Sequence, residues 1–251
     1  MAEHSNGVQS VERTFLLLEI LCKNGETSVT ELSCLSGLHK TTVCRLLSTL
    51  CSLGYVKQNE KTGRYGISLK FLTVSSGILN TFDIRSYARP FFKKLSKESH
   101  ETVHLVCRDG DDIVYIDKFE SPDNSVRMVS RIGFSLPMIC TAVGKAILAS
   151  LDDRTIEKIW NRSSHEQKTP HTITTFDKFM AEINDVRKNG YAVDNEENEL
   201  GVRCVAAALL EPDSVCRYAF SVSAPITRMD DSRLKQIAEL VLEAKKEIIE
   251  K

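Results

Sequence analysis

Two short helical patterns separated by a glycine, within residues 28–53, constrain the fold of this chain more than any other feature. Ser28 is followed three residues later by Glu31, which is the spacing of a capping box at the start of a helix, and this pattern stops at Gly37. A second helix is predicted over residues 40–53, where apolar residues recur at helical spacing. A short helix, a tight turn and a second helix predict a helix-turn-helix unit.

A predicted β-hairpin and a segregated charge follow this unit. Residues 55–58 and 64–67 read as two short strands joined by a glycine-containing turn, which predicts the wing of a winged helix. Residues 39–70 hold six basic residues and one acidic residue, a net of +5 in a chain whose net charge is −1. A basic segment concentrated on one module is typical of nucleic-acid binding. A further apolar helical pattern precedes the unit over residues 8–24.

Position within the winged helix divides the expected DNA contacts into two groups. The first turn of the second helix meets base edges in the major groove, where arginine can bond guanine and threonine can contact thymine. Basic residues of the hairpin suit phosphates. The alternative is a winged helix that binds protein, with these charges solvated. The predicted DNA-binding residues are His39, Lys40, Thr41, Thr42 and Arg45 on the helix, and Lys57, Lys61 and Arg64 on the hairpin.

Residues 100–104 read His-Glu-Thr-Val-His, the pattern that in metalloproteases places two zinc ligands and a general base on one helix. However, β-branched residues follow, and a Gly/Asp turn at 108–112 leads to another apolar run at 113–116, so two strands are predicted. Residues four apart on a strand stand ~13 Å apart, which is too far for one ion. The third ligand of the metzincin pattern is also missing. No metal site is predicted, and a zinc hydrolase is kept as an alternative.

Other patterns for chemistry are incomplete. Residues 133–137 lack the closing glycine of a nucleophile elbow, and residues 141–146 lack the Ser or Thr of a P-loop. The eight cysteines show no C-x₂-C spacing, which favours buried thiols in a reducing compartment. No catalytic residue and no cofactor is therefore predicted. A hydrolase that uses Cys204 is a second enzymatic alternative, although no histidine lies near it in sequence.

Bulk composition indicates a folded protein of one large or two modest domains. The chain has 251 residues, of which 42% are hydrophobic and 27% charged, so it is neither disordered nor supercharged. No apolar stretch approaches the ~18 residues of a membrane span, and the N-terminus lacks the order of a signal peptide. A cytoplasmic protein without a membrane partner is expected.

Several longer stretches point together to one known family. The N-terminal part contains SVERTFLLLEIL, SVTELSCLSGLHKTTVCRLLSTLCSLGYV and GRYGISLKFL; the later part contains ETVHLVCRDGDDIVYIDK, CTAVGKAILAS, GYAVDNEENELGVRCVAAAL and FSVSAP. In this order they resemble the IclR family of bacterial transcriptional regulators, over nearly the whole chain. The resemblance implies an α+β protein with three parts. These are a winged helix-turn-helix DNA-binding domain at 1–69, a linker and dimerisation helix at 70–84, and a GAF-like effector domain with an antiparallel sheet at 85–251.

The resemblance also implies an effector site in the later part. From the residues alone, Thr141 is a candidate N-cap whose helix start offers free backbone N–H groups, which suits a carboxylate. Family effector positions fall on Ala142, Val143, Asp194, Cys204, Ser221 and Ser223. Here the N–H groups would take the carboxylate, and the aspartate and serines would hold hydroxyls or a keto oxygen. The alternative is that the serines satisfy strand edges and the aspartate caps a turn. Val143 departs from the family pattern, and its branched side chain could narrow the carboxylate site.

These observations predict a ligand-responsive DNA-binding regulator, and repression is expected rather than activation. The protein is expected to bind double-stranded operator DNA as a dimer or a dimer of dimers. The stretches NELGVRC, SRIG and IWNRSSHEQ most resemble family branches that regulate sugar-acid catabolism. A small carboxylate, a sugar acid or keto acid, is therefore the expected effector. The rival class is an enzyme, either the zinc hydrolase or the Cys204 hydrolase.

Overall fold

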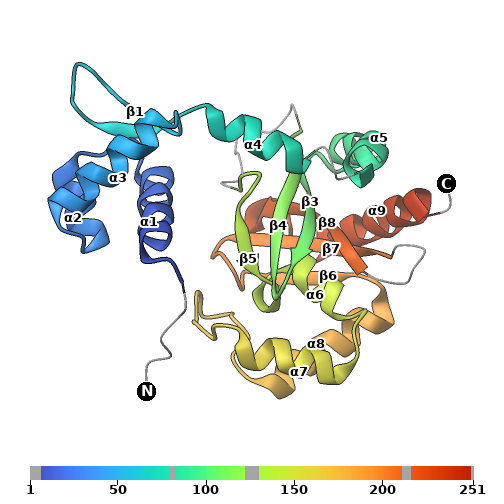
Figure 1. Cartoon of the computed structure of the whole chain (residues 1–251). Coiled ribbons are helices and arrows are strands. Elements are labelled where there is room, and N and C mark those ends of the chain that lie inside the picture. The colour runs from blue at the N-terminus through green and yellow to red at the C-terminus, as the bar shows by residue number, and fades with distance from the viewer. Residues whose placement is uncertain (1–6, 80–82, 122–129, 211–215, 250–251) are drawn as a thin grey trace. The chain divides into compact units, whose positions relative to one another are not determined.

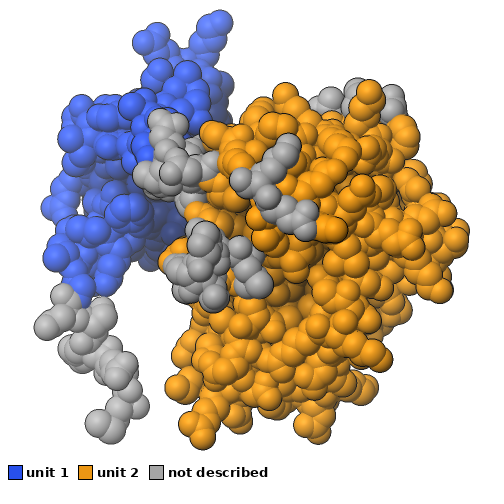
Figure 2. Space-filling view, turned by 90° about the vertical axis from the view of Figure 1, so that its right-hand side faces the viewer, with its two compact units in different colours: residues 1–82 blue, residues 83–251 orange. Residues whose placement is uncertain are grey.

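A computed structural model of the chain describes residues 7–79, 83–121, 130–210 and 216–249. The chain divides into two compact units, residues 1–82 and residues 83–251, which Figure 2 shows in different colours. Figure 1 gives the elements of each unit.

Three helices pack around one apolar core in the N-terminal unit. They are α1 (Gln9–Asn24), α2 (Val29–Ser36) and α3 (Lys40–Ser52). The predicted capping box starts α2: the Glu31 N–H donates to Ser28 Oγ at 3.3 Å, and the Ser28 N–H donates to Glu31 Oε2 at 2.8 Å. The helix-turn-helix prediction is confirmed. The core consists of the buried side chains Leu17, Leu18, Leu21, Leu32, Val43, Leu47, Leu50 and Val56.

A wing and a fourth helix complete this unit. Strands β1 (Val56–Gln58) and β2 (Tyr65–Ile67) pair antiparallel, which confirms the predicted hairpin. Helix α4 spans Lys70–Leu79. The linker helix was predicted over 70–84; residues 80–82 of it lie outside the described residues, and Asp83 already begins the next helix.

Apolar side chains lie exposed on α1 and α4. Val11 and Phe15 continue the apolar pattern of α1, yet they are 50% and 58% exposed, and Leu72 on α4 is 64% exposed. An apolar stripe on a helix normally faces a core. The stripes of these two helices therefore extend beyond what the core of their own unit covers.

A six-stranded antiparallel sheet organises the C-terminal unit, in the order β5-β4-β3-β8-β7-β6. β3 and β8 are far apart in the sequence but lie side by side at the centre of the sheet (Figure 1). The α+β class and the antiparallel sheet are thus confirmed. The strands are β3 (Thr102–Asp109), β4 (Asp112–Phe119), β5 (Ser135–Pro137), β6 (Ala192–Asn195), β7 (Val202–Leu210) and β8 (Cys216–Pro225).

Helices cover both faces of this sheet. α5 (Asp83–Ser99) packs against α9 (Asp231–Ile249), and the ring of Phe92 on α5 lies 5.0 Å from that of Phe220 on β8. α6 (Ala142–Leu148) contacts β6, β7 and β8. It lies on the face of the sheet opposite to Phe220, because Ala219 packs in the same cluster as α6 and side chains alternate along a strand, which places residue 221 on the α6 face too. Behind α6 lie α7 (Asp153–Arg162) and α8 (Phe176–Asn189).

Candidate DNA-binding surface and effector site

The start of α3 presents polar side chains to solvent. His39 caps the helix, since its Nδ1 accepts a hydrogen bond from the Thr41 N–H at 3.4 Å and lies 2.9 Å from Thr41 Oγ1. Lys40, Thr41 and Arg45 are exposed, and Thr42 is half-buried. The five residues predicted to read bases therefore lie along one solvent-facing helix start, whose other face is fixed in the core.

On the wing, the structure gives one predicted DNA contact a different task. Arg64 Nη2 lies 2.7 Å from Glu31 Oε2, and Arg64 Nε donates to the Glu26 carbonyl at 3.0 Å. These bonds tie the wing to α2 and to the turn before it, a role that the sequence pattern did not reveal. Lys57 and Lys61 lie exposed on the same hairpin.

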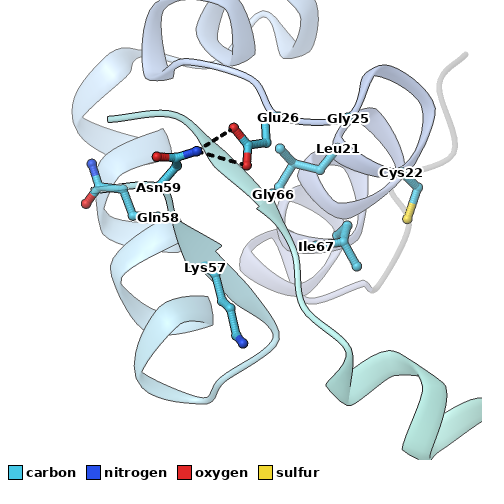
Figure 3. A pocket seen from close by; sticks show the side chains of 9 residues that line it. All are labelled: Leu21, Cys22, Gly25, Glu26, Lys57, Gln58, Asn59, Gly66 and Ile67. Atoms are coloured by element: carbon cyan, nitrogen blue, oxygen red, sulfur yellow. Dashed lines mark hydrogen bonds between the residues drawn. The ribbon is translucent and has the colours of Figure 1, made fainter. Parts of the chain in front are cut away.

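A hollow of about 670 Å³ lies between the end of α1 and the wing (Figure 3). At its rim the Asn59 amide donates to both carboxylate oxygens of Glu26, at 3.2 and 3.1 Å. None of the predicted effector residues lines it. Its lining residues are Leu21, Cys22, Gly25, Glu26, Lys57, Gln58, Asn59, Gly66 and Ile67.

In the C-terminal unit, the sheet register brings predicted effector residues of three strands into one row. Asp194 on β6 is opposite Cys204 on β7, which is opposite Ser223 on β8. Directly opposite residues share a face, and Ser221, two residues before Ser223, shares it too. Asp194, Ser221 and Ser223 are only 5%, 4% and 3% exposed. The row is therefore an enclosed polar patch.

The start of α6 lies against the same face of the sheet. Ala142 and Val143 are its first two residues and belong to the same apolar cluster as Cys204. Their N–H groups precede the intrahelical ladder, whereas the Gly144 N–H donates to Thr141 Oγ1 at 3.1 Å. A Cβ on Gly144 would lie 2.2 Å from the carbonyl oxygen of Met138. Only glycine lets the helix start approach the 3₁₀ turn Met138–Cys140 so closely.

A buried charge cluster lies next to this patch. Lys145 is fully buried, and its Nζ donates to Glu197 Oε1 at 2.6 Å and to Glu182 Oε1 at 3.1 Å. Burial alone would lower the pKa of Lys145, but the two carboxylates outweigh it and the pKa is raised. Asp194 Oδ1 accepts from the Glu197 N–H at 2.8 Å. Burial and the Glu197 charge raise the pKa of Asp194 to about 7, so this carboxyl takes up a proton near neutral pH.

His104 joins the same row, which the sequence analysis missed. It lies on β3 opposite Ser221, with its Nδ1 3.2 Å from Ser223 Oγ and its Nε2 2.6 Å from Ser130 Oγ. Burial and the nearby Lys118 charge lower the pKa of His104 to about 3, so the ring is neutral at pH 7. No sequence pattern places this histidine beside the serines, because the β3–β8 pairing joins segments over 100 residues apart.

Comparison with known proteins decides the family. Residues 76–250 match the family described as bacterial transcriptional regulator IclR C-terminal, and residues 10–60 match the IclR helix-turn-helix domain. The chain belongs to the IclR family. The resemblance deduced from sequence is thereby confirmed, and the chain is a DNA-binding transcriptional regulator.

Individual members of the IclR family align over nearly the whole chain. The HTH-type transcriptional regulator KdgR of Escherichia coli is 35% identical over 243 residues, which cover 97% of this chain and 92% of that protein. XynR of Escherichia coli is 34% identical over 238 residues, 94% of each. The crystal structure of Thermotoga maritima IclR has a TM-score of 0.79 at 30% identity, covering 96% of this chain and 98% of that chain.

Membership of the IclR family removes the enzymatic alternatives, and the geometry agrees. His104 lies in β3 rather than on a helix, so His-Glu-Thr-Val-His cannot place two ligands on one helical face. Burial, and then the Asp194 charge, raise the pKa of the Cys204 thiol, which is opposite to the activation of a nucleophile. Along the part of the chain that the structure describes, no helix is both long and apolar enough to span a bilayer.

Proposed function

We propose that this IclR-family regulator is a repressor whose operator affinity is altered by a small carboxylate bound in the C-terminal unit. One observation carries the proposal: Asp194, Ser221 and Ser223 form a buried polar row beside the start of α6. Buried polar side chains that converge on one place are typical of a ligand site, because a few placed polar groups fix the orientation of a bound molecule.

The chemistry of this row suits a sugar acid or a keto acid. The N–H groups of Ala142 and Val143 would take the carboxylate, stabilised by roughly 0.3–2 kcal/mol from the helix dipole. Asp194 and the serines would hold hydroxyl or keto oxygens, and Cys204 would line the wall between them. Within the described residues, Glu197 Oε2 is buried without a hydrogen-bond partner, so it adds an acceptor beside Asp194. The branched side chain of Val143 would restrict the width of the acid.

On the DNA side, we assign base reading to His39, Lys40, Thr41, Thr42 and Arg45, and phosphate contacts to Lys57, Lys61 and Arg64. Exposure of the α3 start supports the first group, while the Glu31 pairing makes Arg64 the weakest member of the second.

We assign self-association, as a dimer or a dimer of dimers, to the exposed apolar faces of α1 and α4. Two winged helices related by a twofold axis would read half-sites whose centres lie about 34 Å, or a multiple of about 34 Å, apart on the DNA. We assign the protein and its operator to the cytoplasm. An inducing acid must bind the DNA-free arrangement more tightly than the DNA-bound one, since a ligand shifts an equilibrium only by its difference in affinity.

Two measurements on the full-length protein test the proposal. The first is affinity for the DNA upstream of its own gene at two salt concentrations, with a random duplex as the control. Binding about 10³-fold or more tighter than to the random duplex, and weakening steeply with salt, is expected. Equal and weak binding to both duplexes would reject operator recognition.

The second measurement is calorimetric titration with gluconate, xylonate, 2-keto-3-deoxygluconate and pyruvate, in the absence and presence of operator DNA. We expect at least one acid to bind and to change the operator affinity. Absence of binding by all four would reject the effector class.

A further inference from the structure

The ring of His104 uses both nitrogens inside the candidate effector site. The side chain is almost fully buried, with Nδ1 facing Ser223 Oγ at 3.2 Å and Nε2 facing Ser130 Oγ at 2.6 Å. Its ring also meets that of Tyr115 edge-on, with ring centroids 5.2 Å apart. The histidine therefore has a single orientation, fixed from three sides.

A neutral histidine carries one N–H and one bare nitrogen, so its tautomer sets the polarity of both serine contacts. If Nε2–H donates to Ser130, Nδ1 accepts the Ser223 proton, and Ser223 offers lone pairs to a ligand hydroxyl. If Nδ1–H donates to Ser223, the Ser223 proton is available to a keto or carboxylate oxygen. In either case the imidazole holds Ser223 Oγ in place and decides what it presents.

Two other side chains reach Ser223 Oγ, and both contacts are weaker than the one to His104: the Cys204 thiol, which is a weak hydrogen-bonding group, and Ser221 Oγ. Its Oγ lies 3.5 Å from Ser221 Oγ, at the limit of a hydrogen bond, whereas the imidazole contact is 3.2 Å. A hydroxyl group rotates freely unless a partner fixes it, and a fixed group loses less entropy on binding. Among these partners of Ser223, His104 therefore gives the strongest support.

We propose that His104 is a positioning residue of the effector site. It acts through Ser223 and selects acids that carry a hydroxyl or keto oxygen in addition to the carboxylate. The inference rests on the proposed function, because it requires that the row of Asp194, Ser221 and Ser223 bind an acid. It also gives the second histidine of the His-Glu-Thr-Val-His stretch a role that needs no metal.

A pair of variants separates the two nitrogens. An asparagine amide can replace Nδ1 and keep the Ser223 contact, whereas a glutamine amide reaches the position of Nε2 and keeps only the Ser130 contact. We would titrate full-length wild type, H104N, H104Q, S223A and H104Q/S223A by calorimetry. The ligands are matched by chain length: gluconate against hexanoate, xylonate against pentanoate, and pyruvate against propionate.

The expected result is a specific pattern of losses. H104Q and S223A should each weaken binding of the hydroxy or keto acid by about fivefold, the effect of losing one neutral hydrogen bond. The double variant should be no weaker than S223A, because both changes remove the same contact. H104N should match wild type, and affinity for the unsubstituted acids should not change.

Other patterns would overturn the inference. Losses that multiply in the double variant, or equal losses for the unsubstituted acids, would mean that His104 acts only through the general packing of the unit. If wild type binds an acid and H104N is as weak as S223A, the positioning role is rejected while the proposed function stands. If wild type binds none of the acids, the effector class itself is rejected and this inference with it.

Thermal unfolding, followed by the fluorescence of Trp160, checks that each variant folds. Should H104Q fail to fold, H104A and H104A/S223A take the places of H104Q and H104Q/S223A. The inference then requires a loss of about fivefold for H104A and no greater loss for H104A/S223A than for S223A.

Discussion

Replacement of Gly144 by alanine tests the closest backbone approach in the candidate effector site. In an ordinary helix this change gains about 1 kcal/mol, because alanine is the better helix former. Here the new Cβ would lie 2.2 Å from the Met138 carbonyl oxygen and 2.3 Å from Met138 Cα. Both distances are more than ~1 Å shorter than an ordinary van der Waals contact of about 3.5 Å. The Met138 atoms belong to the backbone, so they cannot rotate away as a side chain could.

The overlap decides the sign of the effect. Overpacking costs about 1–3 kcal/mol or more, so we expect G144A to lose at least about 2 kcal/mol of unfolding free energy. In a unit of this size that lowers Tm by roughly 4–8 °C. Trp160 is the only tryptophan in the chain and packs in the core cluster around α6, so its fluorescence reports the unfolding of the C-terminal unit.

A matched control lies in the other unit. Gly77 is also a helical glycine, in α4, and a Cβ there would meet nothing within 4 Å. G77A should leave the Trp160 transition unchanged. Because Ala142 and Val143 would shift with the helix start, G144A should also weaken binding of the acid. A G144A protein with the Tm of G77A and wild-type acid affinity would refute the reasoning.

Three further predictions follow from charged residues. Arg45→Ala should weaken operator binding by about 1–3 kcal/mol and relax its sequence specificity. Lys61→Ala should instead reduce the slope of log affinity against log salt concentration by about one, on any duplex. Equal losses on operator and random DNA from Arg45→Ala would contradict base reading. Lys145→Met should lower the free energy of unfolding, measured with urea, by about 3–5 kcal/mol, because Glu197 stays buried without its cation. Adding Glu197→Gln should restore part of that free energy. The pKa of Asp194 is raised to about 7 in the folded protein, so its contribution to stability is greatest below about pH 4 and is lost as pH rises through 7. Relative to Asp194→Asn, wild type should lose stability between pH 4 and 7 and change little above that; a flat difference would contradict the raised pKa.

Local elements were largely predictable from the sequence, because their signals act over a few residues. Ser28 and Glu31 bond each other across three residues, so their spacing alone predicted the start of α2. Gly37 ends that helix at a φ of +68°, a conformation that glycine adopts without strain. The strand at 102–109 was likewise readable from its β-branched residues, against the competing metalloprotease pattern.

Surface roles were less predictable, because charge patterns do not show which partner a side chain meets. Arg64 counts toward the basic segment, yet its guanidinium bonds Glu31 and the Glu26 carbonyl. Val11 and Phe15 continue an apolar helical pattern but lie exposed on α1. In both cases the outcome depends on where neighbouring elements are placed in space.

The sequence by itself therefore determined the helix-turn-helix with its wing, the basic charge of that module, the succession of helices and strands, and, through extended similarity, the IclR family. Only the tertiary structure decided which side chains share the polar row. Strands β3, β6, β7 and β8 come together through hydrogen bonds between distant segments, and a shift of one residue in any of these pairings would turn its side chains to the other face. For that reason His104, Glu197 and the buried Lys145 beside Asp194 became visible as parts of one site only in the folded chain.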